Sequence, residues 1–156
     1  LKAGINIEVN KNILGIEPSK NLHVSQIESQ PIGIVTLYPG ISTDVIKNTL
    51  QQPVKALILL SFGVGNAPQN ATLLKQLSLA DQQGIIVLNC TQCVRGKVNM
   101  NGYANGHVLR EVGVVSGQDM TPEAALAKLH YLLSKDMPPS HIKRQLIANL
   151  RGELTE

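Results

Sequence analysis

Residues 57–68 read LILLSFGVGNAP and join an unbroken apolar run to a glycine-rich turn. The run 57–60 has no polar face, which is typical of a strand that helices cover on both sides in a parallel sheet. The turn that follows, Ser61–Asn66, contains two glycines, and glycine lets the backbone approach a ligand closely. Because open α/β sheets bind ligands just beyond the carboxyl ends of their strands, this turn is the first candidate for a functional site.

Further apolar runs, at residues 32–38 and 85–88, predict two more buried strands. A weaker run at residues 112–115, interrupted by Gly113, predicts a fourth strand. Helical patterns separate these runs, and such alternation indicates parallel strands joined by right-handed crossovers. The expected fold class is therefore α/β, a three-layer α/β/α domain around a mainly parallel sheet of about four strands.

Capping residues mark where the expected helices begin. Ser42 or Thr43 suits the N-cap of the first helix and Asn70 that of the second. Thr121 followed by Pro122 predicts the start of another long helix, since proline fits the first helical position. The remaining expectations are a short helix near 107–111, a last helix after Ser140, and inward-facing side chains at Val45, Ile46, Leu50, Leu73, Leu74, Leu77, Ala80, Ala125, Leu126, Leu129, Leu132, Leu133, Ile142, Leu146, Ile147 and Leu150.

The chain divides into a weakly patterned start and a well-patterned remainder. We expect residues 1–30 to be a linker with short strands, one at 5–9 and one around Leu22, Val24 and Ile27, and residues 31–156 to form the α/β domain. The chain begins at Leu1 without a signal-peptide pattern, so we expect a piece of a longer cytoplasmic protein.

Composition argues against several kinds of partner. The 156 residues suffice for one domain with a real core. The net charge of +3 comes from scattered lysines and arginines, and the chain has one Phe and three Tyr, so we expect no nucleic-acid partner. No apolar run approaches the length of a membrane helix, so no membrane partner is expected. The two cysteines cannot make a disulfide framework, which favours a reducing cytoplasm.

Small polar residues follow each of the three strong strands, at Tyr38–Thr43, Ser61–Asn66 and Asn89–Cys93. In a parallel sheet these ends share one edge, where Asn66 and Thr91 are placed to hydrogen-bond a small polar ligand. The alternative is that Gly, Asn and Ser occur there only because they suit turns. The residues alone leave both interpretations open.

Two other motifs carry less weight. Gly63-Val64-Gly65 resembles part of a dinucleotide-binding turn, but Pro68 occupies the position of the third glycine. Cys90 and Cys93 form a C-x-x-C, for which small buried thiols are a better interpretation than a redox or zinc site. The redox interpretation predicts a reversible disulfide between these two cysteines.

No catalytic set emerges from spacing. The four histidines are dispersed along the chain, and Thr43-Asp44 suits a helix N-terminus better than a nucleophile with its carboxylate. We therefore expect no catalytic residue in this chain, and no metal site or cofactor.

Five segments together resemble one family, the bacterial cytoplasmic type I L-asparaginases, and specifically their C-terminal domain. They are QPIGIVTLYPGIS (30–42), QPVKALILLSFGVGNAPQN (52–70), NCTQCVRGKVNMNGY (89–103), LHYLLS (129–134) and NLRGELT (149–155). The resemblance implies that the whole enzyme hydrolyses L-asparagine to L-aspartate and ammonia through an acyl-enzyme on a threonine. In this family the catalytic threonines lie in an N-terminal domain, and this chain lacks the Thr-Gly-Gly-Thr turn that carries one of them.

The resemblance also implies roles for individual residues. Asn66 and Tyr103 would reach the active-site cleft of a neighbouring subunit in a homodimer or homotetramer. Some members of the family bind asparagine as an activator, in a pocket that here would involve Ser61, Asn66, Thr91 and Cys93. Those members place an arginine immediately before the serine of the turn, where this chain has Leu60. Leucine cannot hold a carboxylate bidentately, so this chain departs from the activator-binding pattern.

Two hypotheses of different classes remain. The first is the C-terminal domain of an L-asparaginase, serving oligomerisation, completion of the active site and allosteric asparagine binding. The alternative is a free-standing module that binds a small ligand, an amino acid or a nucleotide, at the same strand ends.

Overall fold

A computed structural model describes residues 2–3, 7–8, 23–100 and 104–155. Strand β1 (Lys2–Ala3) pairs in antiparallel orientation with β2 (Ile7–Glu8). The rest of the predicted strand at residues 5–9 lies outside the described residues. Val24 and Ile27 lie in an extended segment without regular secondary structure, so the strand expected around Leu22, Val24 and Ile27 is wrong at Val24 and Ile27, while Leu22 lies outside the described residues.

The main sheet has four parallel strands in the order β3-β4-β5-β6. They are β3 (Ile32–Thr36), β4 (Ala56–Ser61), β5 (Ile86–Thr91) and β6 (Val115–Ser116). Every neighbouring pair runs in the same direction, so the carboxyl ends of the strands share one edge. The predicted fold class and strand direction are confirmed.

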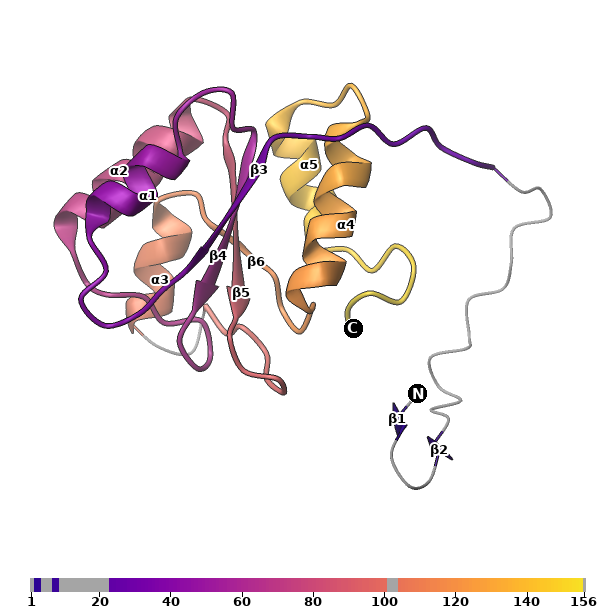
Figure 1. Cartoon of the computed structure of the whole chain (residues 1–156), viewed down its shortest axis with the longest axis horizontal. Coiled ribbons are helices and arrows are strands. Elements are labelled where there is room, and N and C mark those ends of the chain that lie inside the picture. The colour runs from indigo at the N-terminus through magenta and orange to yellow at the C-terminus, as the bar shows by residue number, and fades with distance from the viewer. Residues whose placement is uncertain (1, 4–6, 9–22, 101–103, 156) are drawn as a thin grey trace.

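Helices cover both faces of this sheet (Figure 1). Helices α1 (Thr43–Thr49), α2 (Ala71–Gln82) and α3 (Ala104–Glu111) lie on one face, and α4 (Pro122–Leu133) and α5 (Pro139–Leu146) lie on the other. This is the predicted three-layer arrangement. In the described part of the chain, no helix combines the length and the apolar character that crossing a membrane requires.

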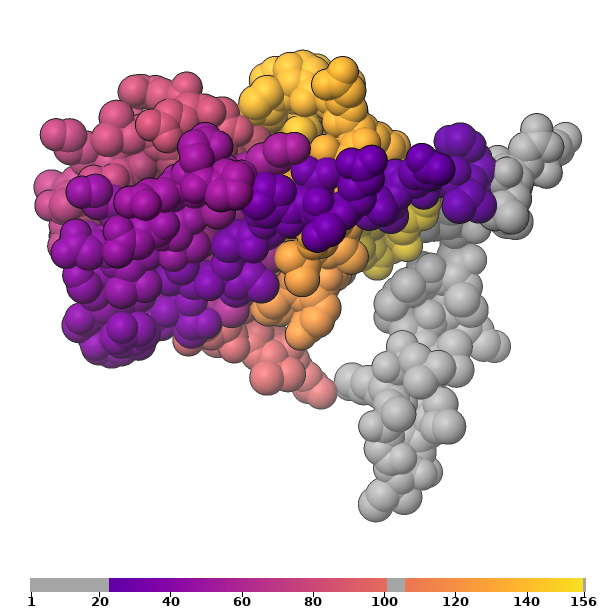
Figure 2. Space-filling view, turned by 45° about the horizontal axis from the view of Figure 1, so that its top comes forward, coloured from indigo at the N-terminus to yellow at the C-terminus, as the bar shows by residue number. Residues whose placement is uncertain are grey.

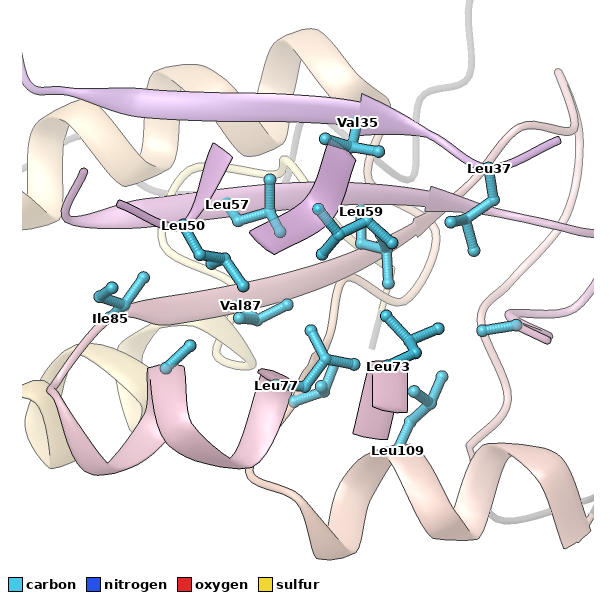
Figure 3. Close-up of a cluster of buried hydrophobic side chains, with 14 of the residues drawn as sticks. Val35, Leu37, Leu50, Leu57, Leu59, Leu73, Leu77, Ile85, Val87 and Leu109 are labelled. Atoms are coloured by element: carbon cyan, nitrogen blue, oxygen red, sulfur yellow. The ribbon is translucent and has the colours of Figure 1, made fainter. Parts of the chain in front are cut away.

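Each face of the sheet has its own hydrophobic core. Along β4, Leu57 and Leu59 point toward α1 and α2, whereas Ala56 and Ile58 point toward α4 and α5. Figure 3 shows the first core, in which Leu73 and Leu77 of α2 face the sheet. Burying a leucine completely contributes roughly 1.5–3 kcal/mol of stability relative to leaving it exposed. Because β4 contributes side chains to both cores, every residue of the run 57–60 is apolar.

The predicted caps are in place. Asn70 accepts hydrogen bonds from the N–H groups of Thr72 (2.8 Å) and Leu73 (3.3 Å) at the start of α2. Ser42 accepts one from Asp44 N–H (3.2 Å), and Thr121 accepts one from Ala124 N–H (3.2 Å). These bonds satisfy N–H groups that a helix leaves unpaired in its first turn.

Two side chains expected to face inward do not. Val45 is 43% exposed because α1 is only seven residues long and buries Ile46 alone within its span. Ile147 is 50% exposed because α5 ends at Leu146, so the helical period no longer applies to the next residue.

The fourth strand is shorter than the predicted 112–115 and begins later, at Val115, because Gly113, at φ +87°, belongs to the turn that follows α3.

The segment before β3 lies across α4 (Figure 2). Glu28 N–H donates to Ser134 Oγ (2.9 Å), and Gln30 N–H donates to His130 Nδ1 (3.1 Å). These contacts fix the direction in which the chain enters the domain.

Candidate functional site

The glycine-rich turn is a tight loop closed on itself. Phe62 N–H donates to Asn66 O and Asn66 N–H donates to Phe62 O, both at 2.9 Å. Gly65 has a φ of +105°, and a Cβ added there would lie 2.7 Å from Val98 Cγ1. Glycine is therefore required at this position by both backbone conformation and space.

Asn89 supports the turn from inside the sheet. Its side chain is fully buried on β5, and its Nδ2 donates to Gly65 O at 2.9 Å. Its Oδ1 is buried without a hydrogen-bond partner among the residues that the structure describes. A buried amide of this kind fixes the position of the backbone it contacts, because losing the bond would leave a carbonyl unpaired.

The two predicted hydroxyl residues lie side by side. Ser61 and Thr91 are register partners at the ends of β4 and β5. Thr91 Oγ1 donates to Gly63 O and accepts from Cys93 N–H (3.0 Å), and Ser61 Oγ donates to Cys90 O (3.1 Å). Both hydroxyls therefore help to hold the loops that follow the two strands.

Gln92 connects three strand ends. Its Nε2 donates to Leu37 O (2.7 Å) and to Leu60 O (2.9 Å), while its backbone N–H donates to Ser61 O (3.0 Å). Sequence analysis included Asn89 and Gln92 in the polar segment Asn89–Cys93 but gave neither a role of its own. It also ended the predicted strand at residue 88, whereas β5 continues to Thr91 and buries Asn89 within it.

The other predicted residues are distributed around this edge. Asn66 is half-buried at the end of the turn, and Cys93 is exposed two residues beyond Thr91. Leu60 is half-buried and packs toward the core on the α4 side of the sheet. Tyr103 lies outside the described residues. Ser61, Asn66, Thr91 and Cys93 are thus all found around one edge of the sheet.

The two cysteines lie in different environments. Cys90 is buried in the core on the α4 side, and burial raises the pKa of its thiol to about 12. Cys93 is exposed, and neither cysteine is in a disulfide. The expectation of small buried thiols is right for Cys90 and wrong for Cys93. A thiol with so high a pKa is a poor redox nucleophile, which argues against the redox interpretation.

The edge offers hydrogen-bonding groups and carries no acid–base pair that we can identify among the described residues. The side chains named above at this edge are hydroxyls, amides and the thiol of Cys93, while His107, His130 and His141 lie on helices α3, α4 and α5. No group of three or more His, Cys, Asp or Glu side chains in the described part of the chain is placed to hold a metal ion.

Helices on both faces of a parallel sheet, with polar loops at its carboxyl edge, define a three-layer α/β domain. The chain belongs to the glutaminase/asparaginase C-terminal domain family, which matches residues 31–146.

Two L-asparaginases and a lysophospholipase are similar to this chain. The chain is 54% identical over 155 residues to L-asparaginase 1 of Escherichia coli K12, covering 99% of this chain and 46% of that enzyme. It is 37% identical over 154 residues to the human 60 kDa lysophospholipase, of which it covers 27%. The crystal structure of L-asparaginase I from Vibrio cholerae matches with a TM-score of 0.89 at 58% identity, over 99% of this chain and 47% of that one. The chain therefore spans about half the length of these two bacterial L-asparaginases.

Proposed function

We propose that this chain is the non-catalytic C-terminal half of an L-asparaginase that hydrolyses L-asparagine to L-aspartate and ammonia. The observation that carries the proposal is how much of each sequence the match includes. Almost all of this chain matches, whereas only 46% and 47% of the two bacterial L-asparaginases are matched. The absence of a Thr-Gly-Gly-Thr turn from the sequence supports a nucleophile supplied by an N-terminal domain.

In this proposal the C-terminal half completes the active site of a neighbouring subunit in a homodimer or homotetramer. Asn66 and Tyr103 are the residues assigned to that cleft. The geometry of the turn supports the role of Asn66, because Phe62 and Asn66 bond to each other through both backbone groups and so hold the loop in one conformation. A residue on a loop held in this way enters a binding site with little loss of conformational freedom.

We further propose that Ser61, Asn66, Thr91 and Cys93 form a weak site for L-asparagine. The support is their shared edge, at the ends of β4 and β5. Leu60 offers no charge for the ligand carboxylate, so we expect affinity well below that of a site with an arginine there. We also propose a cytoplasmic location, because two cysteines in the sequence cannot make a disulfide framework.

A chimaera tests the main proposal. The N-terminal half of Vibrio cholerae L-asparaginase I is joined to residues 1–156, and ammonia release from L-asparagine is measured. We expect the chimaera to be active and the N-terminal half alone to be inactive. A folded chimaera that releases no ammonia would contradict the proposal.

A further inference from the structure

A small cavity lies in the layer that α4 and α5 form, where the two helices pack side by side (Figure 1). Its volume is about 240 Å³, and residues from the end of α4, from α5 and from the C-terminal segment line it. Ser61, Asn66, Thr91 and Cys93 are not part of this lining. The cavity is therefore separate from the site proposed for L-asparagine.

Groups that donate hydrogen bonds surround this cavity. Tyr131 lies on α4 and Lys135 just after it. His141 and Gln145 lie one turn apart on α5, and Arg151 belongs to the C-terminal segment. The described lining contains no Asp or Glu. Three parts of the chain thus bring ammonium, guanidinium, imidazole, amide and phenol donors to one small space.

The positive charges at the cavity are not neutralised within the described part of the chain. There, none of Lys135, His141 and Arg151 forms an ion pair. Lys135 Nζ donates to the hydroxyl of Tyr131, and Arg151 Nη1 donates to Leu150 O (2.7 Å). Both acceptors are neutral, so these bonds position the two cations and leave their charge unopposed.

The acidic residue beside the cavity, Glu153, does not change this balance. Its carboxylate accepts from the backbone N–H of Arg151 (2.6 Å), and it is already paired with the buried ammonium group of Lys128. The pKa of the Tyr131 hydroxyl is lowered, chiefly by the hydrogen bond from Lys135 and further by the charge of Arg151. Both cations therefore act on the same point of the lining.

We propose that this cavity binds a phosphate dianion, either free or as the ester of a small molecule. A concave surface lined by positive charge attracts anions. Phosphate oxygens accept hydrogen bonds from every kind of donor in the lining, and the guanidinium of Arg151 can hold two of these oxygens at once. Lysine binds phosphate as a point charge, which suits the place of Lys135 at the end of α4.

The size of the cavity limits the rest of the ligand. Its 240 Å³ is smaller than the roughly 300–1000 Å³ of sites for drug-sized molecules. A phosphate group therefore leaves room for only a few further atoms. Leu132, Met137 and Leu150 supply an apolar wall for them.

The test is an NMR titration of the full ¹⁵N-labelled chain with inorganic phosphate at pH 8 and constant ionic strength. The side-chain amide of Gln145 and the imidazole of His141 are the reporters. We expect their signals to shift and to saturate, with a dissociation constant of about 1 mM. Arg151→Gln should weaken binding by about tenfold, because it removes the charged fork. Arg144→Gln makes the same change at an exposed position of α5 outside the cavity and should leave the dissociation constant within about twofold.

Two further arms define the ligand. Nitrate, a monoanion, should bind at least about tenfold more weakly than phosphate, because it offers half the charge to the cations. Glycerol 3-phosphate separates the two sources of a phosphate group. Tighter binding of glycerol 3-phosphate than of inorganic phosphate supports a site for an ester, and the reverse order supports a site for the free ion.

Three outcomes would each overturn the proposal. They are equal affinity of Arg151→Gln and Arg144→Gln for phosphate, equal affinity of the natural chain for nitrate and phosphate, and shifts that stay linear up to about 20 mM phosphate. The NMR spectrum itself shows whether each variant is folded. Should Arg151→Gln fail to fold, Lys135→Gln replaces it, with an expected loss of about fivefold. A phosphate site between α4 and α5 does not depend on the chain's role in asparagine hydrolysis, so the two proposals fail separately.

Discussion

Lys128 on α4 and Glu153 near the end of the chain form a buried ion pair, with Nζ and Oε1 2.6 Å apart. The Lys128 side chain is 3% exposed and that of Glu153 is 14% exposed. Lys128 Nζ also donates to Leu146 O (2.9 Å), at the last residue of α5, and to Ala148 O (2.6 Å), two residues further along the chain. One buried ammonium group thus joins α4, the end of α5 and the C-terminal segment.

Replacing Lys128 should destabilise the domain strongly. Lys128→Met leaves Glu153 and two carbonyls without their charged donor, and we expect a loss of about 3 kcal/mol in the free energy of unfolding. Urea denaturation measures it, with Lys75→Met, at an exposed position on α2, as the control. A loss equal to that of the control would show that the ion pair contributes nothing.

The same pair predicts a dependence of stability on pH. Burial raises the pKa of Glu153, but Lys128 and the backbone N–H groups of Leu150 and Arg151 outweigh it and lower the pKa to about 2 from its usual 4.5. A carboxyl whose pKa is lower in the folded state stabilises the protein above its unfolded pKa. That contribution is lost as the pH falls from 4.5 through 2.

We therefore expect the stability difference between the natural chain and Glu153→Gln to be largest above pH 5 and to shrink steadily below pH 4.5. Urea denaturation at pH 7, 5, 4 and 3 checks this. A difference that stays constant over this range would contradict the assigned pKa.

The glycine-rich turn predicts different costs at its two glycines. Gly65→Ala should destabilise by about 2–3 kcal/mol, because alanine at this φ is strained and its Cβ would meet Val98. Gly63, at φ +49°, has open space around it, so Gly63→Ala should cost only about 1 kcal/mol. Adding Val98→Ala to Gly65→Ala should recover part of the loss. Equal costs at the two glycines would contradict the packing of Gly65 against Val98.

Replacing Asn89 should destabilise the domain more than replacing an exposed asparagine. Asn89→Leu removes the donor to Gly65 O and should cost about 2 kcal/mol in the free energy of unfolding. Asn48→Leu, at an exposed position on α1, is the control and should change stability by less than about 0.5 kcal/mol. Hydrogen exchange of the Asn66 amide should speed up in Asn89→Leu if the side chain holds the turn.

Much of the fold was predictable because buried strands and caps leave local signals. The run 57–60 and its two neighbours alternate with capped helices, and this pattern requires parallel strands and two covering layers. The shared edge of Ser61 and Thr91 follows from strand direction alone. Val45 and Ile147 were misplaced because the periodicity of a helix does not reveal where it stops or how narrow its buried face is.

The supporting network at the edge was less predictable. Asn89 and Gln92 both bond backbone carbonyls in distant segments, and a carbonyl acceptor is present at every residue, so it leaves no pattern in the sequence.

The proposed ligand site predicts a gain of affinity. Leu60→Arg should place a guanidinium beside Ser61 and strengthen binding of L-asparagine by tenfold or more, about 1.4 kcal/mol. Calorimetric titration of the folded chain measures it, with Leu60→Lys as the control, since lysine supplies the charge without the bidentate fork. Tight binding to the natural chain would show that Leu60 does not limit the site.

The central claim is that this chain contributes to asparagine hydrolysis without supplying the nucleophile. Ammonia release by the isolated, folded chain with saturating L-asparagine tests it most directly. The account predicts no release above that of buffer. Sustained release in proportion to the concentration of the chain would contradict it.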